Sequence, residues 1–169
     1  VKVTNGGSSV GVSIARTQEE YLEALKAAFS YEEVLIVEHY IEGREFSVGM
    51  VDGEAYPVIE IAPISGFYDY VNKYKEGSTI ETCPAQISDE LTKKMQAAAL
   101  AACKALRLDS YGRVDIMMDS EERVYFLEAN SLPGMTPTSL LPQEAKVLGL
   151  DFTPENGIKQ EPIDPSFKG

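Results

Sequence analysis

The sequence predicts an α+β fold, in which hairpin strands are mixed with helices. Asp52-Gly53 lies between the strand-like segments 45–51 and 55–61, and this dipeptide is a strong signal for a two-residue hairpin turn. Two further strand-like segments flank the polar turn 119–122. A stretch rich in Ala and Leu predicts a helix over 88–106, with Ser88 as its N-cap.

The first part of the chain predicts one helix between short strands. Residues 1–4 are interpreted as the end of a strand, and residues 10–15 as a second strand after a loop. Thr17, followed three residues later by a Glu, makes a capping box and predicts a helix over 17–29. The β-branched run 34–37 is typical of a buried strand.

The rest of the chain adds a long loop, a further hairpin and helix, and an irregular tail. Residues 62–84 carry Pro, Gly and Tyr with little periodicity, so they predict a long functional loop. The second hairpin joins 113–118 to 123–129, and a helix over 139–148 follows it. Residues 151–169 contain prolines without an apolar period and predict an extended or disordered tail.

The composition excludes several classes of function. The 169 residues include 27 Asp and Glu against 15 Lys and Arg, and the net charge of −12 would repel nucleic acid. No apolar run approaches the roughly 18 residues of a membrane span. No secretory signal opens the chain, so we expect a cytoplasmic protein. Cys83 and Cys103 are expected to be reduced thiols, and His39 alone cannot form a zinc site.

A glycine-rich loop is the first candidate for a binding site. It has the sequence Gly6-Gly7-Ser8-Ser9-Val10-Gly11. Glycines let backbone N–H groups approach an anion closely, and serine hydroxyls add donors. A hairpin turn without a ligand explains the loop equally well. The loop lacks the endings that define a Walker or a Rossmann motif.

The second predicted hairpin gathers oxygen ligands on one face. Its turn aligns the strands so that Arg113 faces Glu128 and Asp115 faces Phe126. Asn130 continues the same face, because side chains alternate along a strand. Two carboxylates and an amide beside one guanidinium suit Mg²⁺ and its bound phosphates. The alternative is a solvated hairpin face with a cross-strand Arg–Glu pair, but the small and apolar neighbours of Glu128 favour the functional interpretation.

Two further acidic residues lie near the end of the predicted strand 34–37. Glu38 follows it directly, and Glu45 comes seven residues later. A carboxylate in this position is suited to accept hydrogen bonds from an adenine amino group or a ribose hydroxyl. Equally, Glu38 is explained as a polar residue that ends the strand.

Five motifs together resemble the D-alanine–D-alanine ligase family over residues 1 to about 150. In chain order they are Lys2-x-x-x-Gly6-Gly7-Ser8-Ser9-Val10-Gly11-Val12, Val37-Glu38 with Ile41-Glu42-Gly43-Arg44-Glu45-Phe46, Phe67-Tyr68-Asp69-Tyr70 with Lys73-Tyr74, Gly112-Arg113-Val114-Asp115, and Leu127-Glu128-Ala129-Asn130-Ser131-Leu132-Pro133-Gly134-Met135-Thr136. The last motif, with Ser139-Leu140 after it, is highly specific to this family. The resemblance implies an ATP-grasp fold, with 1–38 as a remnant of the central lid domain, 39–150 as the C-terminal catalytic domain and 151–169 as an atypical tail.

The resemblance also implies a role for each candidate residue. ATP would be bound by Lys2, Glu38, His39, Ile41, Glu45, Phe67 and Leu127. Two Mg²⁺ or Mn²⁺ ions would be bound by Asp115, Glu128 and Asn130. The catalytic residues would be Ser8, Lys73, Tyr74, Arg113 and Gly134, and Ser139 with Leu140 would bind the second D-alanine.

The implied reaction joins two D-alanines for peptidoglycan precursors. The carboxylate of the first D-alanine attacks the γ-phosphate of ATP to give an acyl phosphate, which the amine of the second then attacks. Arg113, Lys73 and the metals neutralise the developing charge, and a lid over the site excludes water. At full length the family is expected to form homodimers.

The chain departs from the family pattern at several points. Val3 stands where Pro is usual and His39 where Lys is common, and the residues after Asp151 do not continue the usual terminal helix. Nothing corresponds to the N-terminal domain or to the first part of the central domain. We therefore expect the full-length protein to be a ligase and this chain alone to be inactive.

Two other functions remain open from the sequence. One is a related ligase that makes D-alanyl-D-serine or D-alanyl-D-lactate, although Lys73-Tyr74 argues against lactate. The other is a non-catalytic nucleotide-binding remnant or regulatory module. Retention of every metal-binding position argues against the second.

Overall fold

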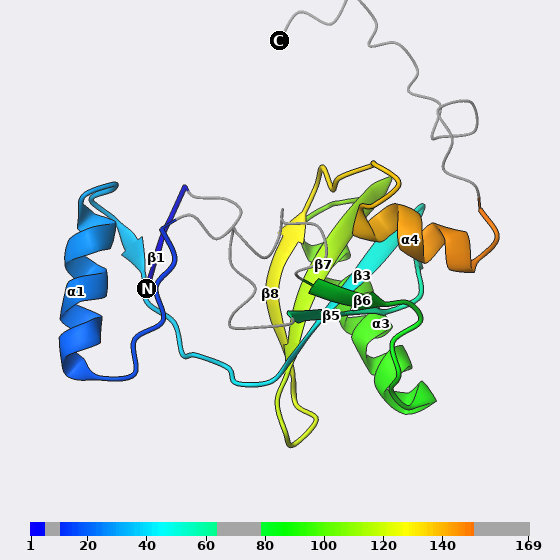
Figure 1. The fold of residues 1–169 in the computed structure, drawn as a ribbon. Coiled ribbons are helices and arrows are strands. Elements are labelled where there is room, and N and C mark those ends of the chain that lie inside the picture. Colours follow the sequence, from blue (N-terminus) through cyan, green and yellow to red (C-terminus); the bar gives the residue numbers. More distant parts are fainter. Residues whose placement is uncertain (6–10, 64–78, 151–169) are drawn as a thin grey trace, which may run out of the picture.

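The computed structural model describes residues 1–5, 11–63 and 79–150, and these form two separate antiparallel sheets (Figure 1). The small sheet pairs β1 with β2, and residues 37–43 connect it to a main sheet of order β6-β5-β3-β7-β8, with β4 beside β3. The strands are β1 (Lys2–Val3), β2 (Leu35–Ile36), β3 (Arg44–Val51), β4 (Glu54–Ala55), β5 (Ile59–Pro63), β6 (Thr79–Thr82), β7 (Tyr111–Met118) and β8 (Val124–Asn130). Hairpins mixed with helices confirm the α+β prediction.

Helix α1 (Gln18–Phe29) packs beside the small sheet and begins as the sequence predicts. The Thr17 side chain accepts from the Glu20 amide, while the Glu20 carboxylate accepts from the Thr17 amide, so the capping box is confirmed. The strand predicted over 10–15 is wrong for the described residues 11–15. Only Val1 and Ser13 exchange backbone hydrogen bonds there, too few to form a strand ladder.

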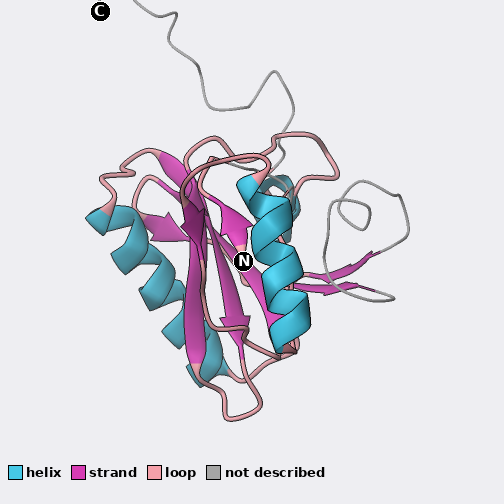
Figure 2. Cartoon of the chain, turned by 90° about the vertical axis from the view of Figure 1, so that its left-hand side faces the viewer, coloured by secondary structure: helices cyan, strands magenta, loops and turns pink. Residues whose placement is uncertain are grey.

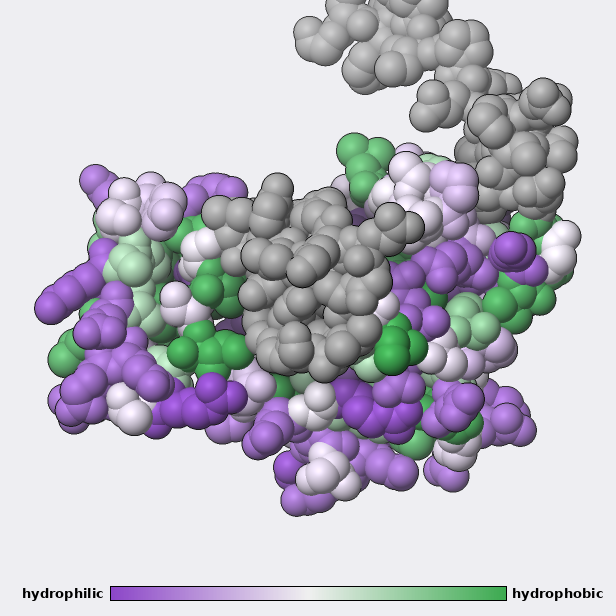
Figure 3. All heavy atoms as spheres, viewed as in Figure 1, coloured by the Kyte–Doolittle hydropathy of each residue, from purple (hydrophilic) through white to green (hydrophobic). Residues whose placement is uncertain are grey.

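The expectation of a buried strand at 34–37 is also wrong. Only Leu35 and Ile36 pair, and Val34 and Val37 are 66% and 54% exposed. A β-branched run indicates strand conformation but not what covers it, and within the described ranges only β1 pairs with β2. Apolar residues are visible on the surface of this part in Figure 3.

The hairpin at Asp52-Gly53 is confirmed, with one difference. Both residues have positive φ, 49° and 79°, as a two-residue hairpin turn of type I′ requires. The strand predicted over 55–61 is divided, because β4 ends at Ala55 and β5 begins at Ile59. The predicted long loop 62–84 is likewise interrupted by β6, which pairs with β5.

The hairpin of β7 and β8 has a different register from the predicted one. Near the turn Met118 pairs with Val124, and beyond a β-bulge at Asp115/Ile116 the pairs are Asp115 with Glu128 and Arg113 with Asn130. The predicted pairs of Arg113 with Glu128 and of Asp115 with Phe126 are therefore wrong. A bulge adds one residue to one strand and shifts all later pairs.

Helix α3 (Asp89–Ala105) covers one face of the main sheet, as Figure 2 shows from a second direction. Ser88 caps it by accepting from the Leu91 amide. Its buried residues, Leu91, Met95, Ala99 and Cys103, pack against the even-numbered side chains of β3 and β7. Each large side chain buried here contributes about 1.5–3 kcal/mol to stability.

Helix α4 (Leu140–Val147) lies on the opposite face of the sheet. Its Leu141 and Ala145 pack with Tyr56, and its Leu140 packs with Ile59 and Ile61. The odd-numbered side chains of β3 and β7 point to this face, so it is the face that carries the predicted site. None of the helices in the described ranges is long and apolar enough to cross a membrane.

Candidate active site

The centre of the site is the Asp115 carboxylate on β7. Arg113 donates to it twice, Nε to Oδ1 and Nη2 to Oδ2, both at 2.8 Å. The Ser47 hydroxyl, from the neighbouring strand β3, donates to Oδ1 at 2.9 Å. Asp115 and Ser47 are both buried, so this carboxylate is held by protein donors in a site largely closed to water.

Two residues of β8 complete the predicted oxygen-rich group. Asn130 donates through Nδ2 to Asp115 at 3.2 Å and to Glu128 at 3.4 Å, while Glu128 itself is exposed. The structure thus brings together Arg113, Asp115, Glu128 and Asn130, as predicted. Phe126 was predicted on the same face, and this prediction is wrong. Phe126 pairs with Ile116, whose side chain lies in the core on the opposite face of the sheet.

The donor set of this group fits a hard divalent cation. Two carboxylates and one amide are ligands that Mg²⁺ prefers, and an exposed Glu128 leaves one side open to a nucleotide. Binding would require Asn130 to present its amide oxygen and would put the cation in competition with Arg113 for Asp115. By the chemistry of their donor atoms, Asp115, Glu128 and Asn130 fit Mg²⁺.

The N-terminus of α4 has no side-chain cap. Ser139 occupies the N-cap position, but its hydroxyl makes no capping bond and instead contacts Thr136, whose amide donates to it at 3.1 Å. The first turn contains no acidic residue. Because the first amides of a helix lack partners inside it, they favour a negatively charged ligand.

Gly134 lies against this helix start. A Cβ added at Gly134 would approach the Ser139 hydroxyl within 2.7 Å, closer than real Cβ contacts. The predicted residues Gly134, Ser139 and Leu140 are therefore brought together.

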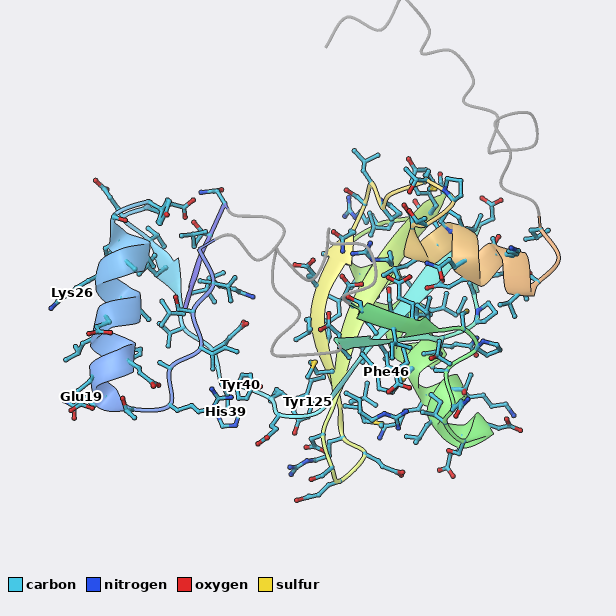
Figure 4. All side chains as sticks on the ribbon, viewed as in Figure 1. Glu19, Lys26, His39, Tyr40, Phe46 and Tyr125 are labelled. Atoms are coloured by element: carbon cyan, nitrogen blue, oxygen red, sulfur yellow. The ribbon has the colours of Figure 1, made fainter. Side chains whose placement is uncertain are left out.

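The residues predicted to bind ATP are spread along the connection between the sheets. Lys2 and Glu38 form an ion pair of 3.0 Å across the small sheet. His39 and Ile41 follow on the connecting segment, where Figure 4 labels His39 and Tyr40. Glu45 lies on β3 and pairs with Met117, on the face that carries Asp115. Leu127 is 37% exposed on β8.

Four of the predicted residues lie outside the described ranges. These are Ser8 in the glycine-rich loop, and Phe67, Lys73 and Tyr74 in the loop predicted to close over the site. The tail 151–169 lies outside as well.

Glu144 on α4 belongs to this site although the sequence analysis did not select it. It is fully buried, and its Oε2 accepts from the Gly49 amide at 2.6 Å. Burial raises the pKa of Glu144 well above its ordinary value, the Gly49 hydrogen bond and Arg113 lower it, and Asp115 raises it further. A Glu inside the apolar run Leu140, Leu141 and Ala145 was the one available signal.

The fold and the site together define a class of protein. An antiparallel sheet that carries carboxylates, an amide and an arginine on one face, with helices on both faces, fits an ATP-grasp domain, and solved D-alanine–D-alanine ligases share this structure. The structure from Bacillus anthracis has a TM-score of 0.75 and 36% identity, covering 89% of this chain and 48% of that one. The VanG D-Ala:D-Ser ligase from Enterococcus faecalis has the same TM-score at 32% identity, covering 89% and 45%.

Sequence comparisons identify the family. The family model described as D-ala D-ala ligase C-terminus matches residues 1–154. The D-alanine–D-alanine ligase of Pediococcus pentosaceus is 45% identical over 153 residues, which are 90% of this chain and 43% of that protein. The chain belongs to the D-alanine–D-alanine ligase family and matches its C-terminal part. It spans about half the length of the curated relatives it matches.

Proposed function

We propose that this chain is the C-terminal part of an ATP-dependent ligase that joins two D-alanines. The observation that carries the proposal is the grouping of Arg113, Asp115, Glu128 and Asn130 on the face of the sheet that α4 covers. This grouping of two carboxylates, an amide and a guanidinium supports a site for a cation and its bound phosphates. Relatives that carry the ligase name at 41% to 45% identity support it.

The first half of the reaction needs charge neutralised around a phosphoryl group. The carboxylate of one D-alanine attacks the γ-phosphorus of ATP, the bond to the β-phosphate oxygen breaks, and an acyl phosphate and ADP form. Mg²⁺ held by Asp115, Glu128 and Asn130 would supply positive charge at these phosphates. A structure of the Bacillus anthracis ligase in complex with ATP, at TM-score 0.70 and 36% identity, supports nucleotide binding.

The second half needs an oriented amine and a stabilised oxyanion. The α4 N-terminus at Ser139 and Leu140 binds the carboxylate of the second D-alanine through its unpartnered amides. Its amine attacks the acyl carbon, and Arg113 stabilises the oxyanion together with the backbone at Gly134. Collapse of this intermediate expels phosphate and leaves the dipeptide. In this structure Arg113 donates to Asp115, and a cation bound at Asp115 would leave the guanidinium available to the oxyanion.

We propose the same family roles for the other parts of the chain. Residues 1–38 are part of the central lid domain, 39–150 form the catalytic domain, and Ser8, Lys73 and Tyr74 come from loops that close over the reactants. The dipeptide serves peptidoglycan precursors in the cytoplasm, and the full-length protein is a homodimer. Without the preceding domains, which position the first D-alanine, the chain makes no dipeptide.

D-Serine is the second candidate for the incoming amino acid. The similarity to the VanG D-Ala:D-Ser ligase, with a TM-score equal to that of the Bacillus anthracis ligase, is the observation that favours it. Both amino acids carry the carboxylate that the α4 N-terminus would bind, so this feature does not separate them.

The test joins residues 1–150 to the preceding half of the Pediococcus pentosaceus ligase. With ATP, Mg²⁺ and D-alanine we expect D-alanyl-D-alanine, ADP and phosphate by mass spectrometry, and no dipeptide from the 169-residue chain alone. Arg113→Gln in the fusion should abolish dipeptide formation. A preference for D-serine over D-alanine as second substrate would replace the proposed substrate, and a dipeptide rate unchanged by Arg113→Gln would refute the proposed site.

A further inference from the structure

We propose that Glu144 is a positioning residue, which fixes the N-terminus of α4 relative to Arg113 so that the carboxylate site of the second amino acid faces the reacting centre. The proposal rests on the proposed function and adds to it one residue from outside the expected site. Four features of the structure support it.

The first feature is a hydrogen bond between elements that are distant in sequence. The Glu144 carboxyl accepts from the Gly49 amide at 2.6 Å, across 95 residues. On this edge of β3, pairing with β5 ends at Ser47 and pairing with β4 begins at Met50, so the Gly49 amide lies in the gap between two strand partners. The Glu144 carboxyl accepts the hydrogen bond that a backbone carbonyl of a neighbouring strand would otherwise accept.

The second feature is the absence of a side chain at Gly49. A Cβ there would overlap both the Leu141 Cδ1 atom and the Glu144 Oε2 atom. Gly49 therefore allows α4 to come close to the strand. On its other edge Gly49 pairs with Arg113. One glycine thus connects the helix that carries Ser139 with the strand that carries the catalytic arginine.

The third feature is the short distance along α4 between Glu144 and the N-cap residue Ser139. Glu144 lies five residues after Ser139, which is about 7.5 Å along a helix. Apolar packing of Leu141 and Ala145 holds α4 on the sheet but has no direction of its own. The hydrogen bond is directional, so it fixes where along β3 the helix begins.

The fourth feature is the state of the Glu144 carboxyl. Its Oε1 atom is buried and has no hydrogen-bond partner among the described residues. The titratable groups that act on it or respond to it are Arg113, Asp115, Tyr56 and Cys83. Burial raises the pKa of Glu144 well above its ordinary value and so favours the neutral acid. A neutral acid has the shape and acceptor of Gln, which allows a conservative replacement.

The experiment compares variants of the 169-residue chain by NMR, with D-alanyl-D-alanine as the probe. Glu144→Gln keeps the acceptor, Glu144→Met keeps the volume without it, and Lys146→Ala is the control on the exposed side of α4. We expect Glu144→Met to shift the Gly49, Ser139 and Leu140 amides and to weaken dipeptide binding about fivefold, the effect of one hydrogen bond. Glu144→Gln and Lys146→Ala should match the original chain.

Three results would overturn the proposal. The first is a Glu144→Met variant with unchanged amides and affinity, and the second is a Glu144→Gln variant that loses as much as Glu144→Met. The third needs no variant: a Gly49 amide that exchanges with solvent as fast as the amide of the exposed Glu42 is not hydrogen bonded. A fourth result separates the two proposals. If the original chain does not bind the dipeptide, the proposed substrate fails. If Glu144→Met nevertheless shifts the Ser139 amide signal and Glu144→Gln does not, the positioning role of Glu144 stands.

Discussion

Arg113 and Asp115 form a two-point ion pair on one strand, with both guanidinium–carboxylate distances at 2.8 Å. The two side chains lie on the same face because they are two positions apart on β7. Together with Ser47 and Asn130 the guanidinium satisfies the Asp115 carboxylate. A divalent cation at Asp115 would compete with this arginine for the carboxylate, so in the proposed mechanism metal binding would make the guanidinium available to a substrate.

Glu128→Gln should weaken Mg-ATP binding to the chain, because it removes one charged ligand from the exposed side of the site. We expect at least a severalfold rise in the Kd for Mg-ATP by isothermal titration calorimetry. Glu23→Gln, on the exposed surface of α1, makes the same charge change away from the site and should leave the Kd unchanged. Equal affinities for the original chain and Glu128→Gln would remove Glu128 from the ligand set.

Ser47→Ala should destabilise the folded chain. The buried Ser47 hydroxyl donates to Asp115 at 2.9 Å, and its loss leaves the carboxylate with one donor fewer. The expected decrease in the free energy of unfolding is about 1 kcal/mol, measured by urea denaturation. Ser120→Ala, in the exposed hairpin turn, serves as the control. A Ser47→Ala variant as stable as this control would show that the hydroxyl contributes nothing to holding Asp115.

Tyr125→Phe should raise the pKa of Asp119. Burial raises this pKa, but hydrogen bonds from Arg123, Tyr125 and Glu121 outweigh it and hold the pKa well below its ordinary value. A depressed carboxyl pKa stabilises the fold above the unfolded pKa of about 3.9, and this contribution is lost as the pH falls below it. Tyr125→Phe should therefore move acid unfolding to higher pH.

Carbon-13 NMR of the Asp119 carboxyl measures this shift directly. Tyr31→Phe is the control, because Tyr31 is 70% exposed on the small sheet side and does not contact the hairpin. An Asp119 pKa that stays the same in Tyr125→Phe would mean that the tyrosine hydroxyl does not stabilise the ionised carboxylate.

Cys83 should react slowly with alkylating reagents. Both cysteines are free, as expected from their spacing, and Cys83 is partly exposed. Burial, with a smaller contribution from Glu144, raises the pKa of Cys83 to about 12. Because only the thiolate reacts, its rate with iodoacetamide at pH 8 should be far below that of free cysteine. The measurement uses Cys103→Ala to isolate Cys83, and a rate equal to that of free cysteine contradicts the expected pKa.

The parts of the fold that follow local rules were predictable from the sequence. Thr17 begins a helix because its capping box involves only neighbouring residues, and Asp52-Gly53 forms the expected turn because few residues accept positive φ. The face shared by Arg113 and Asp115 follows from simple alternation.

The features that depend on distant contacts were not predictable. Strand β6 forms because β5 offers a partner, and prolines and glycines nearby hide its alternation. The role of Glu144 depends on a contact with Gly49, 95 residues away, and no local pattern indicates that bond. The exposure of Val34 depends on what lies beside the small sheet rather than on the residue itself.

The bulge in the β7–β8 hairpin has a consequence for how this strand tolerates insertions and deletions. Val124 and Ala129 both pack on the face of the sheet that α3 covers, although they are five positions apart. In a regular strand, two residues an odd number of positions apart point to opposite faces. The extra residue changes the parity of the strand, so that Glu128 and Asn130 point to the site while Val124 keeps its place in the core. Removing one residue between Val124 and Glu128 would remove the bulge, and regular alternation from Val124 would still place Glu128 on the face of the site. Adding one residue there, by contrast, would turn Glu128 and Asn130 toward the apolar interior.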